Sequence, residues 1–145
     1  MKYRLFQSVY AVANVGLMAY GLMAAIDPSI LLEPFSEHVY EFPTNAIDAV
    51  IYLGALFRLL SFFNLLLGAF GLLLLWRWRL GYELWILRSL IGLTVSSYLG
   101  PVVFDNTVGA IGFFEIIEHI VFLAALALGI VMLSDSRPRA AAESG

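Results

Sequence analysis

Three ionisable side chains are predicted to lie on one face of a helix in the last third of the chain. Glu115 and Glu118 are three residues apart, and Glu115 and His119 are four apart, so all three project the same way from a helix. Two carboxylates and an imidazole in this spacing could transfer protons, hold the polar head of a ligand, or form a buried ion-pair network. If the chain is an enzyme, Glu118, Glu115 and His119 are its candidate catalytic residues.

Arg58 is predicted to lie at the same depth as Glu118 and His119, with Glu115 about one turn shallower. It comes ten residues after Asp48, where we expect a membrane span to begin, and Glu118 comes eight residues after Ala110, where another begins. At 1.5 Å per residue, both would lie roughly 12–15 Å into a bilayer. An unpaired charge at that depth costs at least ~2.5–3.5 kcal/mol. The sequence therefore predicts that Arg58 pairs with Glu115 or Glu118, so that their two helices face each other.

The same region of the bundle is predicted to form a polar pocket. The residues expected to bind a ligand there are Arg58, Glu115, Glu118, His119, Asn14 and Tyr98. A metal ion would need carboxylates or histidines from further helices, as in di-iron bundles, and the other spans supply no such set. The sequence therefore predicts no metal site, and no cofactor other than a bound lipid or quinone.

The composition requires a membrane environment for these residues. The chain of 145 residues is 61% hydrophobic and 13% charged, whereas a soluble domain has about a quarter of its residues charged. It contains no cysteine, which excludes disulfides and thiol chemistry. Four apolar runs approach the ~20 residues that a helix needs to cross a bilayer, and in lipid such runs must be helical. They cover about residues 5–26, 48–76, 84–104 and 110–133.

The basic residues predict how these spans are oriented. They precede the first span, separate the second from the third, and follow the fourth: Lys2, Arg4, Arg77, Arg79, Arg137 and Arg139. The other two connections contain no Lys or Arg. Because basic residues stay on the cytoplasmic side, we predict an all-α, up-down-up-down bundle of four transmembrane helices over residues 1–133, with both termini in the cytoplasm.

Each predicted span has a face of small or polar residues, which normally packs against other helices in a membrane. The residues expected to point inward are, on the first span, Gln7, Ala11, Asn14, Met18, Gly21 and Ala25, and on the second, Gly54, Arg58, Ser61, Asn64, Gly68 and Gly71. On the third span they are Ser89, Gly92, Ser96 and Gly100, and on the fourth, Gly112, Glu115, Glu118, His119, Phe122 and Gly129.

Two segments lie outside the predicted spans. The outer loop, residues 27–47, is long for a connection; it is either an interfacial connector or a lid over the pocket, with His38 as a pH-sensitive member. Residues 134–145 are polar and contain Pro138, and we expect a disordered cytoplasmic tail.

The chain resembles the DoxX family of small four-helix bacterial and archaeal membrane proteins and its uncharacterised relatives. The residues that carry the resemblance are Asp27-Pro28, Tyr52-Leu53-Gly54, and Glu115 or Glu118. The resemblance implies the four-helix fold and the plasma membrane of a prokaryote. Members of this group have been linked to membrane oxidoreductase subunits or have no known activity, so it does not imply a reaction.

Three functions from different classes fit these features. The first is an accessory or subunit-like membrane protein whose outer-half pocket holds a lipid- or quinone-like molecule, or which packs against other membrane proteins or a second copy. The second is an intramembrane acid–base enzyme of the isomerase type, acting on a hydrophobic substrate. The third is a small transporter or proton-conducting protein. Nucleic-acid binding is excluded because the chain has no soluble basic surface beyond three pairs of cations at the membrane edge.

Overall fold

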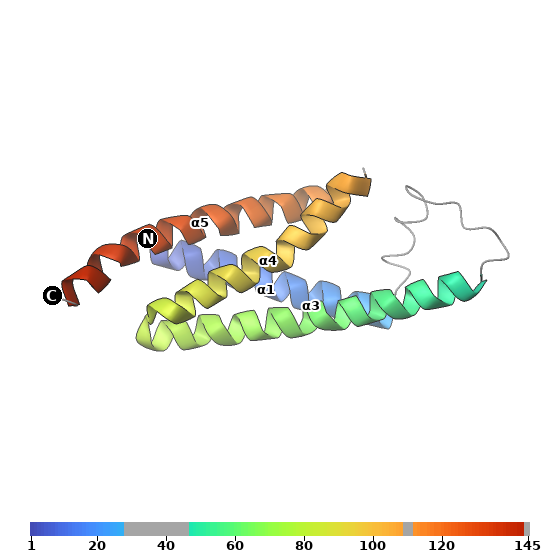
Figure 1. Ribbon diagram of the computed structural model, residues 1–145, viewed down its shortest axis with the longest axis horizontal. Coiled ribbons are helices and arrows are strands. Elements are labelled where there is room, and N and C mark those ends of the chain that lie inside the picture. Colours follow the sequence, from blue (N-terminus) through green and yellow to red (C-terminus); the bar gives the residue numbers. More distant parts are fainter. Residues whose placement is uncertain (28–46, 109–111, 144–145) are drawn as a thin grey trace.

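The computed structural model describes residues 1–27, 47–108 and 112–143, which form four helices and no strand. The helices are α1 (Lys2–Ile26), α3 (Ile47–Gly81), α4 (Leu84–Val108) and α5 (Phe113–Glu143) (Figure 1). All four are long and apolar enough to cross a membrane, which confirms the prediction of four helical spans. Residues 28–46 of the outer loop, which include His38, lie outside the described residues.

Two helices extend past their predicted ends. Helix α3 continues to Gly81, and its first turns project beyond the ends of the other three helices (Figure 1). Helix α5 continues to Glu143, so residues 134–143 are helical, where we expected a disordered tail. The alanines at 140–142 provide the physical reason, because alanine has the highest intrinsic helix propensity.

Helices α1 and α3 pack closely through glycines. A Cβ added at Gly21 of α1 would lie 2.5 Å from the backbone oxygen of Ser61 in α3, and one added at Gly68 would lie 2.5 Å from the backbone oxygen of Asn14. Side chains of any size would hold the backbones further apart. These contacts make α1 and α3 antiparallel neighbours and confirm that their small-residue faces point inward, with the exception of Arg58.

The prediction for the small-residue face of α4 is wrong. Ser89, Gly92, Ser96 and Gly100 are exposed, and a Cβ added at either glycine would meet no atom within 4 Å. The buried face carries large side chains instead: Ile86, Leu87, Leu90, Ile91, Thr94 and Tyr98. The small residues of α1 and α3 pack against each other. The large side chains of α4 then fill the remaining space between α4 and this helix pair.

An aromatic cluster closes the end of the bundle where α3 meets α4. Trp78 is 2% exposed; its ring centroid lies 5.3 Å from that of Phe6 and 5.2 Å from that of Tyr82, both edge-on, and it stacks with Tyr3 at 6.3 Å. Such geometries suit the ring quadrupoles. The cluster fixes the first turns of α1 against the last turns of α3.

A two-residue turn joins α3 to α4. Tyr82 has a φ of 52°, in the left-handed region, and its N–H donates to the backbone oxygen of Trp78 at 2.7 Å, which caps the end of α3. The carboxylate of Glu83 accepts from Arg77 at 2.7 Å and from the indole of Trp85 at 2.6 Å. At the same end of the molecule, Lys2 forms an ion pair with Asp135 that links α1 to α5.

Candidate functional site

Glu115 has a capping role at the start of α5. Its Oε2 accepts a hydrogen bond from the backbone N–H of Gly112 at 2.9 Å. Gly112 immediately precedes the helix and Glu115 is its third residue, so this contact is the carboxylate half of a capping box. A carboxylate near the N-terminus is also stabilised by the helix dipole. The structure therefore explains Glu115 as a helix-capping residue.

His119 connects α5 to α4. Its Nδ1 lies 2.6 Å from the backbone oxygen of Glu115, and its Nε2 lies 2.8 Å from Nδ2 of Asn106. The same Nδ2 donates to the backbone oxygen of Val102 at 2.7 Å. Because a carbonyl oxygen can only accept, Nδ1 carries the proton, and Nε2 then accepts from Asn106. Both nitrogens of the ring are thus engaged.

We expect Asn106→Ala to change the tautomer balance of His119. Without the amide donor, Nε2 is no longer held as an acceptor, and protonation at Nε2 competes with protonation at Nδ1. The measurement is ¹⁵N NMR of ring-labelled histidine, with His38→Gln used for assignment because the chain has only two histidines. Thr107→Ala, beside Asn106 but bonded within its own helix, serves as the control. An unchanged His119 spectrum in Asn106→Ala would contradict the assigned hydrogen bond.

Tyr98 of α4 packs against α1, and against α5 one turn after Glu118. Tyr98 is buried, and its hydroxyl donates to the backbone oxygen of Ala13 at 2.7 Å, which links α4 to α1. Glu118 is half-buried. Tyr98, Ala13 and Leu17 form a small apolar cluster with Val121 and Phe122, one turn along α5 from Glu118.

Asn14 lies at the centre of the bundle, away from the side chains at the start of α5. It is 0% exposed. Its Nδ2 donates to Thr94 Oγ1 at 3.0 Å and to the backbone oxygen of Tyr10 at 2.8 Å, and the Tyr10 hydroxyl donates to the backbone oxygen of Ala125 at 2.8 Å. Two side chains thus join α1 to α4 and α5. Asn14 Oδ1 is buried and has no hydrogen-bond partner among the described residues.

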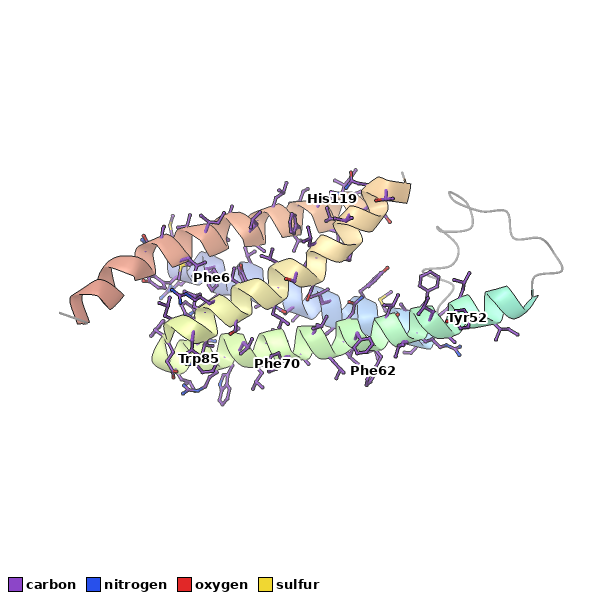
Figure 2. All side chains as sticks on the ribbon, in the orientation of Figure 1. Phe6, Tyr52, Phe62, Phe70, Trp85 and His119 are labelled. Carbon is purple, nitrogen blue, oxygen red and sulfur yellow. The ribbon has the colours of Figure 1, made fainter. Side chains whose placement is uncertain are left out.

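The predicted ion pair between Arg58 and the glutamates of α5 is absent from the described residues. Arg58 is exposed, and α3 packs on α1 and α4 and makes no extensive contact with α5. In Figure 2, His119 lies on α5 along one edge of the molecule, whereas Arg58 belongs to the stretch of α3 between Tyr52 and Phe62, along the opposite edge. The prediction is wrong because depth was counted from Asp48, and α3 begins well beyond the other helices.

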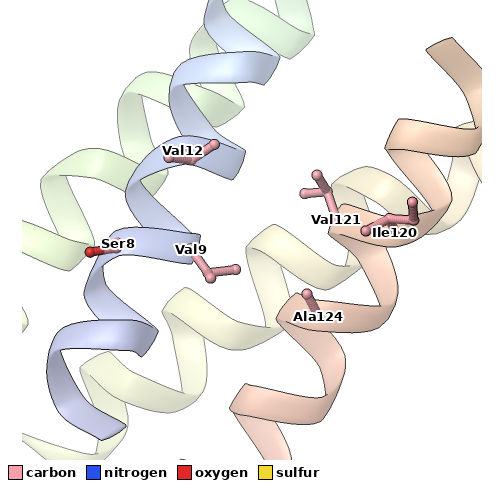
Figure 3. A pocket seen from close by; sticks show the side chains of 6 residues that line it. All are labelled: Ser8, Val9, Val12, Ile120, Val121 and Ala124. Carbon is pink, nitrogen blue, oxygen red and sulfur yellow. The ribbon is translucent and has the colours of Figure 1, made fainter. Parts of the chain in front are cut away.

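An apolar groove lies between α1 and α5. Its volume is about 220 Å³, and its lining is almost entirely apolar: Ser8, Val9, Val12, Ile120, Val121 and Ala124 (Figure 3). Val12 and Ile120 are 65% and 61% exposed, so the groove opens on the outside of the bundle. Helix α4 passes behind it (Figure 3). The groove is smaller than the ~300–1,000 Å³ of most small-molecule pockets, a size that suits part of a hydrocarbon chain.

The structure therefore brings together some of the predicted site residues and separates others. Glu115, Glu118 and His119 share the start of α5 with Tyr98 nearby, while Asn14 lies deeper and Arg58 on another surface. The described residues contain no cluster of three or more His, Asp or Glu side chains that could hold a metal ion. Sequence reasoning missed Asn106 because it placed the end of the third span at Phe104. It missed the groove because apolar residues on two separate helices give no local signal.

No protein-family model, curated protein or solved structure matches this chain. The resemblance to the DoxX family stays a prediction.

Proposed function

We propose that the chain is a small accessory membrane protein that holds a lipid- or quinone-like molecule along the groove between α1 and α5. The observation that carries the proposal is the groove itself, which opens on the outside of the bundle and is lined almost entirely by apolar side chains (Figure 3). Glu118 lies one turn of α5 before Val121, which lines the groove. A chain in the groove would therefore have its polar end beside Glu118.

We propose an up-down-up-down arrangement in the plasma membrane of a prokaryote, with both termini in the cytoplasm. The cations Lys2, Arg77 and Arg79 gather at one end of the molecule, where the Lys2–Asp135 ion pair also lies. Basic residues favour the cytoplasmic side. The groove then opens to the lipid, so a hydrophobic ligand would enter from within the bilayer.

The geometry favours binding over acid–base chemistry. A general base needs a free lone pair within reach of substrate. The Nε2 lone pair of His119 accepts from Asn106, and Oε2 of Glu115 caps α5. His119 and Glu115 thus have structural roles, and this is the basis on which we propose a non-catalytic role.

We expect Ala124→Phe to reduce the amount of co-purified ligand at least several-fold, because a phenyl ring at the half-buried Ala124 fills the groove. The chain would be purified in mild detergent, and bound molecules would be extracted and quantified per protein by mass spectrometry. Ala127→Phe is a matched control: it lies on the same helix, is exposed, and does not line the groove.

Equal recovery of the same molecule from both variants would contradict a site in the groove. A wild-type protein that carries no hydrophobic molecule, both in detergent and after reconstitution with lipid extract, would contradict the proposed function as a whole.

A further inference from the structure

The contacts between α1 and α3 determine the depth of Arg58. Gly21 lies against Ser61, Gly68 against Asn14, and Phe6 against Trp78, so the two helices keep one antiparallel register along their length. Continuing from Gly21 to the end of α1, this register places Asp27 level with the turn of α3 around Arg58. Arg58 therefore lies where α1 ends.

The spacing of arginines along α3 gives an independent estimate of the same boundary. Residues 59–76, between Arg58 and Arg77, contain no charged side chain. Arg58 and Arg77 are nineteen residues apart, which at 1.5 Å per residue is roughly 28 Å. The hydrocarbon core of a bilayer is ~30 Å thick. The two guanidinium groups are thus spaced to reach the phosphates of opposite leaflets.

We propose that Arg58 binds the phosphate of an outer-leaflet phospholipid, and that α3 leaves the hydrocarbon core at this residue. Arg58 is exposed and forms no ion pair within the described part of the chain. A guanidinium group binds phosphate oxygens through paired N–H donors, and a long arginine side chain reaches the headgroups from a helix surface. Residues 47–57 then extend outside the hydrocarbon core. This proposal does not depend on the ligand in the groove.

The first test measures depth with spin labels. Since the chain has no cysteine, single cysteines can be placed at Tyr52, Phe62 and Phe70, all more than half exposed. In vesicles of phosphatidylcholine and phosphatidylglycerol, we expect the label at 52 to be accessible to a water-soluble nickel chelate. Labels at 62 and 70 should be accessible mainly to oxygen. A label at 52 as inaccessible to the chelate as that at 62 would overturn the proposed boundary.

The second test detects the phosphate contact itself. The protein would be labelled with ¹³Cζ-arginine and reconstituted in the same vesicles. In solid-state NMR, the signal of a guanidinium carbon is dephased by ³¹P only when that carbon lies close to a phosphate. We expect Arg58→Gln to lose part of the dephased signal, and Arg88→Gln provides a matched loss of one exposed arginine elsewhere. If Arg58→Gln removes only signal that ³¹P does not dephase, the Arg58 guanidinium is not close to a phosphate and the proposal fails.

Discussion

Gly71→Ala is expected to destabilise the bundle by about 3 kcal/mol, at the upper end of the usual range for overpacking. A Cβ at this position of α3 would overlap the amide oxygen of Asn14 and lie 2.5 Å from its Cγ. Either α1 and α3 must separate, or the Asn14 side chain must move and lose its hydrogen bond to Thr94. Each response disrupts an interface that depends on close backbone approach.

The measurement is the midpoint of unfolding in mixed micelles of mild detergent and SDS, followed by circular dichroism. Gly92→Ala is the matched control, because a Cβ there meets nothing within 4 Å; it should leave stability unchanged or raise it by up to ~1 kcal/mol through helix propensity. In an Asn14→Ala background, Gly71→Ala should cost much less. Equal effects of Gly71→Ala and Gly92→Ala would show that the Asn14 contact is not close-packed.

Trp78→Ala is expected to cost about 3–5 kcal/mol, the usual range for removing a buried large aromatic side chain. Trp78 is 2% exposed, and it touches Tyr3, Phe6 and Tyr82. Its loss would leave a cavity where α1 meets the end of α3. The expected result is a lower unfolding midpoint and loss of the blue-shifted component of tryptophan emission.

Trp76→Ala provides the comparison for Trp78→Ala. It lies two residues earlier on the same helix and is 58% exposed, so its removal changes the lipid-facing surface and not the packed cluster. We expect a loss of less than ~1 kcal/mol. Similar destabilisation by the two substitutions would mean that the aromatic cluster does not hold this end of the bundle together.

Hydropathy predicted the existence of the helices, but it could not decide which side of α4 points inward. In a water-soluble protein, apolar side chains are buried and polar ones are exposed, so the sequence pattern of a helix reveals which face is buried. In lipid both faces of a helix are apolar, and packing shape decides. Gly92 and Leu90 are equally compatible with lipid, and only the space left by α1 and α3 selects Leu90 for the interior.

The candidate site was predictable where interactions are local. The helical spacing of Glu115 and His119 follows from sequence alone, and both side chains do bond within the first turns of α5. The partner of Arg58 was not predictable, because its depth depends on the register of α3 against α1. Asn106 was missed for a similar reason, since α4 continues four residues past the predicted end at Phe104.

The short turn at Tyr82 and Glu83 restricts how the polypeptide can be inserted into the membrane. With only these two residues between α3 and α4, neither helix can adopt an orientation independent of the other. A chain inverted across the bilayer would have to invert both together, and would carry Arg77 and Arg79 to the opposite compartment against their charge preference. The short turn therefore requires α3 and α4 to enter the membrane as one unit during biogenesis.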